Sequence, residues 1–292
     1  MHTDSELIQV LERLSSRNGT GQTAITGLSL YHSSQSTNRQ PIVLYPAICV
    51  VAQGHKNLYF GDYTRSYNAD NYLINSVTMP VEMEITGASE DKPYLGLSLE
   101  IDSYLVSQLL IDMGKFDNNS RTLANDIIVS TAINDQLENS FVRLLKCLES
   151  DMDQEVLAPA IKREIFYEVL KGLHGNLLRN CVAHHAGANR IAPVVHYIEK
   201  NFQQPLDIDT IARYAGMSSS SLHDHFKQAT SMTPMQFVKS LRLHQAHSLL
   251  LSGNPVSESS YKAGYNSPSQ FSREFKRFFG NTPSDIQLQA SG

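Results

Sequence analysis

The segment NSPSQFSREFKRFFG, residues 266–280, combines a helix start, an apolar stripe and a helix stop. Asn266 or Ser267 can cap a helix, and Pro268 is tolerated in the first turn, where its missing N–H has no helical partner. The stripe has helical spacing, and its residues are Phe271, Phe275, Phe278 and Phe279. Gly280 follows as a stop. The opposite face is polar and cationic, so this segment alone fits an ordinary surface helix as well as a DNA-reading one.

The preceding residues favour the second interpretation. In PVSESSYKAGY, residues 255–265, Pro255 can start a helix and Gly264 suits the left-handed turn that ends it. A helix, a tight glycine turn and a second helix with a polar outer face form a helix-turn-helix, whose second helix can enter a DNA major groove. We therefore predict a helix-turn-helix over residues 255–280.

The same arrangement occurs earlier, over residues 207–230. Asp207 and Ser218 are the predicted caps, Gly216 the turn, and Leu222 and Phe226 the apolar anchors. The Ala-Gly pair recurs 48 residues later, whereas the anchoring Phe and the trailing Thr-Pro recur 49 residues later. We place the extra residue within the second helix. Two units with matching caps, turn and anchor are a strong signal for a repeated helix-turn-helix.

A third helix is predicted between the units, over residues 234–251. Thr233 is its expected cap and Pro234 its first residue. Its 18 residues would span roughly 27 Å, close to the roughly 34 Å between successive major-groove faces on one side of a duplex. Such a rod would let one chain reach two half-sites.

This double unit resembles the AraC/XylS-type transcriptional regulators. The resemblance covers about residues 190–288 and includes LRLHQAHSLL on the joining helix and AGYNSPSQFSREFKRFFGNTPSDI at the end. It implies a two-groove reader of double-stranded promoter DNA that usually activates transcription beside a promoter, with RNA polymerase as a partner. In such proteins the outer face of each second helix meets base edges. The positions implied here are Ser219, Ser220, His223, Ser269, Gln270, Ser272 and Arg273.

Asp224 departs from the family, which often has a basic residue at this place. A carboxylate can accept a hydrogen bond from cytosine N4 but repels phosphates, so Asp224 either reads an unusual base or weakens the first unit. Arg273 is the better candidate for a bidentate guanine contact. Four further cations of this region are either phosphate contacts or solvated, namely Lys239, Arg242, Lys276 and Arg277.

The charge is unevenly distributed along the 292 residues, whose formal net charge is −5. Residues 190–292 carry 10 Lys and Arg against 7 Asp and Glu, and the remainder carries 14 against 22. A cationic end and an acidic partner domain agree with a DNA-binding domain at residues 190–292 and a second domain at residues 1–182. We expect the linker at residues 183–189, where small residues are frequent.

The N-terminal domain shows strand patterns between residues 23 and 99. Val81, Met83 and Ile85 alternate with Glu82 and Glu84. Many short strands with close turns predict a small barrel or sandwich. The stretch from PIVLYPAICVVAQGHK to PYLGLSLEID resembles the cupin-like N-terminal domain of one subgroup of these regulators. The resemblance implies a barrel that senses a small effector or mediates self-association, and an α+β protein of two domains.

A ligand pocket and an enzymatic site are both considered for this barrel. Six tyrosines can either line a pocket or simply pack in strands, namely Tyr31, Tyr45, Tyr59, Tyr63, Tyr67 and Tyr72. A metal-dependent cupin needs clustered histidines, whereas only His32 and His55 occur here, so we predict no metal, no cofactor and no enzyme. A metal-dependent enzyme or sensor tethered to DNA is the alternative, and a structural DNA-bending protein is a third class.

Helices are expected at residues 104–113, 133–148 and 155–173. The two longer ones either cover the barrel or pair with a second chain, and the resemblance favours a homodimer. Cys181, His184 and His185 invite a metal reading, but adjacent histidines on a helix diverge and no fourth ligand is near. The three cysteines include no CxxC pair, the N-terminus lacks signal-peptide blocks, and no stretch approaches 18 apolar residues. These features predict a cytoplasmic protein without a membrane segment.

Overall fold

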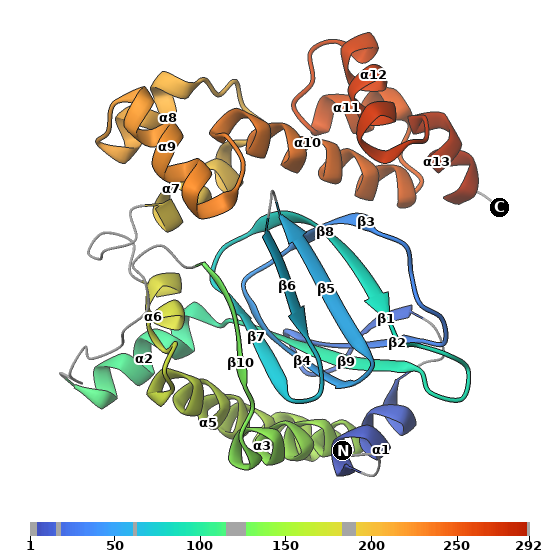
Figure 1. Cartoon of the computed structure of the whole chain (residues 1–292), viewed down its shortest axis with the longest axis vertical. Coiled ribbons are helices and arrows are strands. Elements are labelled where there is room, and N and C mark those ends of the chain that lie inside the picture. Colours follow the sequence, from blue (N-terminus) through green and yellow to red (C-terminus); the bar gives the residue numbers. More distant parts are fainter. Residues whose placement is uncertain (1–4, 16–18, 61–62, 115–126, 183–190, 291–292) are drawn as a thin grey trace.

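Two antiparallel sheets face each other, with one helical layer below them and a helical domain above (Figure 1). The structure is a computed structural model that describes residues 5–15, 19–60, 63–114, 127–182 and 191–290. The expected linker at residues 183–189, with His184 and His185, lies outside the described residues. The predicted α+β class and the division into a sheet domain and a helical end are confirmed.

The strands are short, and each pairs only with antiparallel neighbours. One sheet has the order β1-β2-β9-β4-β7-β10 and the other β3-β8-β5-β6. Their bounds are β1 Gly19–Gln22, β2 Leu28–Ser33, β3 Gln40–Leu44, β4 Ala47–Gln53, β5 His55–Phe60, β6 Tyr63–Tyr67, β7 Asn71–Asn75, β8 Met79–Thr86, β9 Tyr94–Glu100 and β10 Ile128–Ala132.

Strand β4 is buried on both faces, which explains its unbroken apolar sequence. Because side chains alternate along a strand, Ile48 and Val50 belong to the core shared with the helices below. Cys49 and Val51 belong instead to the core shared with the second sheet. The alternation predicted for β8 is confirmed, with Val81 and Met83 buried and Glu82 exposed.

The cupin-like expectation is refined by the sheet order. The strands form two separate sheets, without hydrogen bonds closing them into one ring, so the sandwich rather than the closed barrel describes this domain. A register shift between Val51 and Gln53 bends β4 at its end. Such bulges increase local twist and end regular pairing.

The helical layer covers the outer face of the six-stranded sheet. Its elements are α1 Glu6–Leu14, α2 Ser103–Met113, α3 Asp135–Lys146, a 3-10 turn Cys147–Glu149, α4 Asp151–Val156, α5 Ala158–Lys171 and α6 Asn176–Val182. The single helix predicted at residues 155–173 is wrong, because α4 ends at Val156 and α5 starts at Ala158. Pro159 lies in the first turn of α5 and lacks the N–H that a continuous helix would need.

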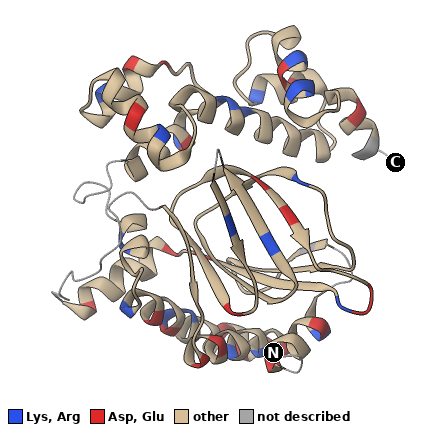
Figure 2. Cartoon of the chain, in the orientation of Figure 1, with Lys and Arg blue, Asp and Glu red and all other residues tan. Residues whose placement is uncertain are grey.

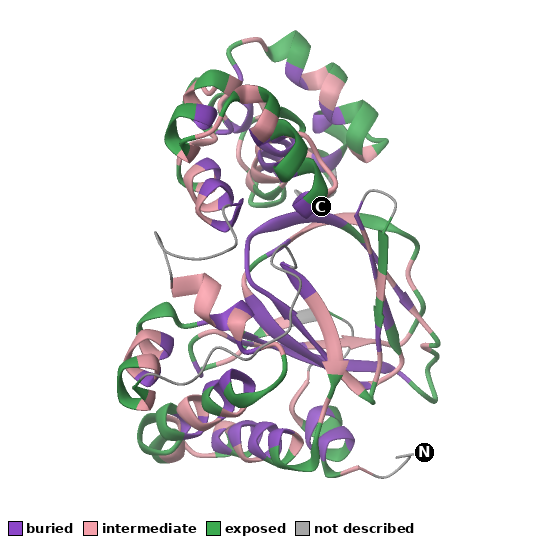
Figure 3. Ribbon diagram, turned by 60° about the vertical axis from the view of Figure 1, so that its left-hand side comes forward, coloured by how far each residue is buried: buried purple, intermediate pink, exposed green. Residues whose placement is uncertain are grey.

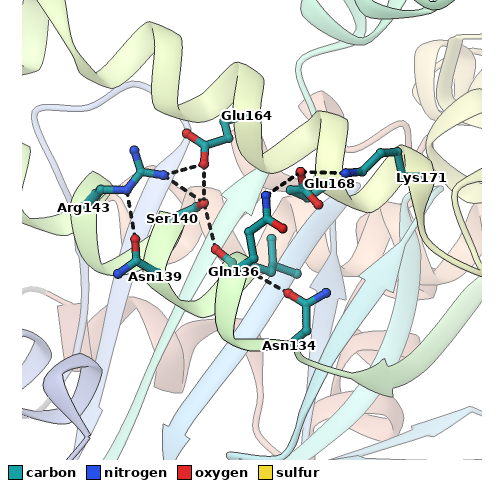
Figure 4. A network of polar contacts seen from close by, with 9 residues as sticks. Asn134, Gln136, Asn139, Ser140, Arg143, Glu164, Glu168 and Lys171 are labelled. Atoms are coloured by element: carbon teal, nitrogen blue, oxygen red, sulfur yellow. Dashed lines mark hydrogen bonds and ion pairs between the residues drawn. The ribbon is translucent and has the colours of Figure 1, made fainter.

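Helices α3 and α5 are also joined by a polar network (Figure 4). The buried Ser140 hydroxyl donates to Glu164 Oε1 at 3.0 Å, and Arg143 forms an ion pair with the same carboxylate. The apolar stripes of both helices lie in the core beneath the sheet. A second chain would therefore have to use a different surface from those stripes.

The upper domain consists of helices only. They are α7 Ile191–Asn201, α8 Ile208–Ala215, α9 Ser219–Thr230, α10 Pro234–Leu251, α11 Val256–Lys262, α12 Pro268–Phe279 and α13 Pro283–Ala290. The predicted joining helix and α10 have the same bounds. Thr233 and Gln236 form a reciprocal capping box at its start, which fixes that boundary.

The two domains share one apolar cluster. Leu44 and Met79 of the sheets belong to it together with Val195 of α7 and Phe237 of α10. Helix α10 lies along β3 and β8, and the buried ends of the sheets face the upper domain (Figure 3). The sandwich and the helical domain therefore pack on each other through an apolar cluster of side chains.

Candidate DNA interface and effector cavity

Helix α10 connects two helix-turn-helix units, α8–α9 and α11–α12. Leu222 and Phe226 anchor α9, and Phe271 and Phe275 anchor α12, and all four side chains are fully buried. Ser218 accepts from the N–H of Ser221, and Ser267 accepts from the N–H of Gln270, so each second helix has a serine cap. Either Asn266 or Ser267 had been expected at α12, and the cap is Ser267.

The extra residue of the second unit lies in the turn. Helices α9 and α12 have 12 residues each, whereas the turn has one more residue between Gly264 and Ser267 than between Gly216 and Ser218. The expected position within the second helix is therefore wrong. Both glycines have positive φ, 62° at Gly216 and 89° at Gly264.

Helix α12 presents an open cationic face. Ser269, Gln270 and Arg273 are exposed, and Ser272 is partly exposed with its hydroxyl donating to the Pro268 carbonyl. In the described part of the chain, no hydrogen bond or ion pair holds the Arg273 guanidinium. Figure 2 shows basic positions of α12 on the side of the domain away from the sheets. This face is therefore not used in the packing of the helical domain on the sandwich.

Helix α9 presents a face whose polar groups already have partners. Ser219 donates to Asp209 Oδ1 at 2.8 Å, and His223 Nδ1 lies 3.5 Å from Asp224 Oδ1. Ser220 and Asp224 are exposed. An ion pair between His223 and Asp224 would reduce the repulsion that the carboxylate exerts on a phosphate, provided that the histidine is protonated.

Two of the four predicted phosphate contacts have intramolecular partners. Arg242 Nε donates to the Phe202 carbonyl at 2.7 Å, and its Nη2 donates to the Gln204 carbonyl at 2.9 Å. Lys239 Nζ lies 3.0 Å from Glu274 Oε1. Arg242 thus ties α10 to the end of α7, and Lys239 ties α10 to α12. Lys276 and Arg277 are exposed.

The second unit is also fixed by close backbone contact. A Cβ built on Gly264 would lie 2.7 Å from the Gln203 carbonyl oxygen, which is closer than such atoms approach. Arg242 binds the carbonyls on either side of Gln203. Together these contacts set the orientation of the two units, an arrangement that no local sequence signal showed.

The sandwich encloses a cavity of about 720 Å³ between its sheets. Its lining includes Lys56 of β5, Cys49 of β4, Tyr67 of β6 and Ile42 of β3. The Tyr31 hydroxyl and Ser98 hydroxyl are 2.9 Å apart. The cavity is large enough for a small organic molecule, and its lining mixes apolar side chains with hydroxyl, amide and charged groups.

Three of the six candidate tyrosines line this cavity, Tyr31, Tyr45 and Tyr67. The others point elsewhere: Tyr59 bonds to Glu84, Tyr63 stacks on Phe60, and Tyr72 lies in the core shared with the helices. Tyr94, Cys49 and Lys56 also line the cavity and were missed. Strand parity would have found Lys56, which alternates inward with Leu58 and Phe60.

Among the described residues, no group of three or more His, Cys, Asp or Glu side chains is placed to hold a metal ion. His32 and His55 lie on β2 and β5. No described helix is long and apolar enough to cross a membrane.

Two family profiles match this chain. The profile of the AraC-type transcriptional regulator N-terminus covers residues 24–177, more than half of the chain, and that of a helix-turn-helix domain covers residues 211–289. The activator RhaS of Yersinia pestis (strain Pestoides F) is 27% identical over 162 residues, or 54% of this chain and 58% of RhaS. RhaS of Escherichia coli (strain SMS-3-5 / SECEC) is 28% identical over 152 residues, which cover 51% of this chain and 54% of that RhaS. The chain thus spans about half the length of these curated relatives.

Solved structures share the fold at low identity. Unsaturated fatty acid-bound ToxT from Vibrio cholerae aligns with a TM-score of 0.59 at 13% identity, covering 94% of this chain and 97% of ToxT. A second ToxT structure, bound to a naphthalenyl butenoic acid, aligns with a TM-score of 0.60 at 14% identity. This alignment covers 90% of this chain and 98% of ToxT. These similarities establish the same two-domain architecture.

Proposed function

Because the chain belongs to the AraC-type transcriptional regulators, we propose that it is a sequence-specific DNA-binding activator controlled through its N-terminal domain. The observation that supports this most is the pair of helix-turn-helix units on one rigid helix, α10. Its 18 residues span roughly 27 Å, so both second helices can reach successive major-groove faces of one duplex.

The proposed base contacts concentrate on α12. Arg273 is exposed and free of competing partners among the described residues, so its guanidinium can form two hydrogen bonds to guanine O6 and N7. Ser269, Gln270 and Ser272 lie on the same exposed side. On α9, Ser220, His223 and Asp224 are the candidates, with Ser219 held by Asp209. We therefore expect the second unit to supply more of the sequence discrimination.

We propose fewer phosphate-contacting residues than the sequence suggested. Lys276 and Arg277 remain candidates because both are exposed on α12. Lys239 and Arg242 are better described as structural, because Glu274 and two backbone carbonyls already engage them. Moving Arg242 and Lys239 to phosphates would break these hydrogen bonds and this ion pair.

The test is selection of DNA fragments by the full-length protein at near-physiological salt, followed by affinity measurements on the enriched site. Arg273→Ala should lose about 1–3 kcal/mol of discrimination at one base position, since a bidentate contact is removed. The matched variant Arg277→Ala should weaken all sequences about equally and lower the salt slope by about 1. Equal losses on specific and non-specific DNA for Arg273→Ala would refute the base contact.

Control through the N-terminal domain is supported by the cavity between its sheets. Structural neighbours with this architecture hold a fatty acid and a naphthalenyl butenoic acid, so the fold accommodates small organic ligands. We further propose promoter DNA and RNA polymerase as partners, a homodimer as the active form and the cytoplasm as the location. Sedimentation at tens of micromolar tests the dimer, and a monomer there would contradict it.

A further inference from the structure

The cavity between the sheets contains a buried lysine without a counter-ion. Lys56 is only 6% exposed, and its Nζ lies 4.9 Å from the centre of the Tyr31 ring. Among the described residues, no carboxylate forms an ion pair with it. Other lysines of the chain do have such partners, for example Lys146 with Glu6 and Lys262 with Glu258.

Burial of an ammonium without a counter-ion is costly, so it shifts the protonation equilibrium of this lysine toward the uncharged amine. Burial lowers the pKa of Lys56, which the neighbouring Cys49 only partly offsets. Glu100 and His32 also line the cavity, and Glu100 is exposed to solvent. In its uncharged form this amine has a free lone pair at the cavity and is a nucleophile.

The thiol and phenol groups around this amine favour their neutral forms, in which they keep their protons. Burial raises the pKa of the Cys49 thiol and holds those of the Tyr67 and Tyr94 phenols well above their usual range. Lys56 pairs with Tyr67 across β5 and β6 and with Ile85 across β5 and β8, so its position is fixed by two strands. The cavity therefore offers one nucleophilic nitrogen and several hydroxyl donors.

We propose that the effector is a small aldehyde that Lys56 captures as an imine. The nitrogen lone pair attacks the carbonyl carbon, and the carbonyl oxygen takes a proton to give a carbinolamine. Loss of that hydroxyl with a proton from nitrogen releases one water and leaves a carbon–nitrogen double bond. The reaction is reversible and needs no oxidant or reductant. The protonated phenols can donate hydrogen bonds to the carbonyl oxygen as charge develops there.

The effect of the imine on DNA binding rests on the proposed function. The imine would fill a cavity that is partly lined by a strand in contact with the DNA-binding domain. Ile42 and Leu44 of β3 line the cavity, and β3 packs against α10. An adduct at Lys56 can thereby favour one position of α10 on the sandwich. A ligand shifts such an equilibrium only through a difference in affinity between the two states.

The first experiment treats the full-length protein with benzaldehyde and sodium cyanoborohydride, which reduces an imine to a stable benzyl amine. Peptide mass mapping should find the adduct on Lys56, approaching one per chain, before the exposed Lys146 reacts. Benzaldehyde cannot undergo conjugate addition, so Cys49 gives no stable product. Uniform labelling of surface lysines with Lys56 unmodified would overturn the proposal, and this result does not depend on any variant.

The second experiment uses Lys56→Met, with Lys146→Met as the matched control. Methionine fills the same space without a charge, and thermal melting followed by circular dichroism reports folding. Benzaldehyde should change the affinity for the selected DNA in wild type and Lys146→Met but not in Lys56→Met. Sodium benzoate is tested in parallel. If it raises the melting temperature of wild type but not of Lys56→Met, and benzaldehyde leaves Lys56 unlabelled, the cavity binds organic anions and the aldehyde proposal fails. If Lys56 is labelled but the protein selects no DNA, the proposed regulatory function is refuted and the proposed imine at Lys56 is still supported.

Discussion

Gly264→Ala should destabilise the DNA-binding domain more than the same change in the first unit. Alanine at a left-handed φ costs about 1–2 kcal/mol at either turn, where φ is 89° at Gly264 and 62° at Gly216. At Gly264 the new methyl group would also lie 2.7 Å from the Gln203 oxygen and 3.0 Å from its Cα. Backbone must move there, which typically costs about 1–3 kcal/mol more. At Gly216 nothing lies within 4 Å of the methyl position.

The assay is urea unfolding of the full-length variants followed by circular dichroism, together with binding to duplexes that carry one or both half-sites. Gly264→Ala should shift the unfolding of the helical domain further than Gly216→Ala, by about 1–3 kcal/mol. It should also weaken binding to the double site more than to the single site, because the contact with Gln203 sets the orientation of the units. Equal stability losses in the two variants would refute the reasoning.

Two further variants test the structural side chains of α10. Arg242→Ala should lower the free energy of unfolding by about 1.5–3 kcal/mol, since hydrogen bonds from a charged group to two carbonyls are lost, while the salt slope of DNA binding stays unchanged; a lower slope would show a phosphate contact instead. Burial lowers the pKa of His244 to about 4, below its unfolded value of about 6.5, so the unfolded chain binds more protons between these values. Stability should therefore fall by up to about 3 kcal/mol as the pH decreases from 6.5 to 4, and His244→Gln should flatten this dependence in pH-resolved melting curves.

The helical domain was predictable because its signals are local. The caps Thr233 and Ser267, the prolines after them and the glycine turns act within one helical turn, and α10 accordingly has the expected bounds. The partners of Arg242 are about 40 residues away in the sequence. No periodicity encodes that pairing, so the Arg242 side chain was expected either on a phosphate or in solvent.

The strands of the sandwich were visible in the alternation of residues, whereas their assignment to two sheets was not. That assignment depends on pairing between distant segments, such as β2 with β9. The same limit applies to the cavity. Tyr59 and Tyr67 look alike in sequence, but Tyr67 is buried between the sheets and Tyr59 faces outward to Glu84. Lys56 shares the inward parity of Leu58 and Phe60, but it was overlooked because a lysine in a strand ordinarily faces solvent.

The apolar cluster shared by both domains bears on how such proteins exchange parts. Leu44 and Met79 on one side and Val195 and Phe237 on the other form a single water-excluding unit. A DNA-binding domain joined to another sensor domain would expose this apolar surface to solvent, and exposed patches of this kind promote aggregation. Recombination at the linker therefore yields a working chimera only when the new sensor domain has an apolar surface that fits this one. The two domains are accordingly expected to evolve as a pair.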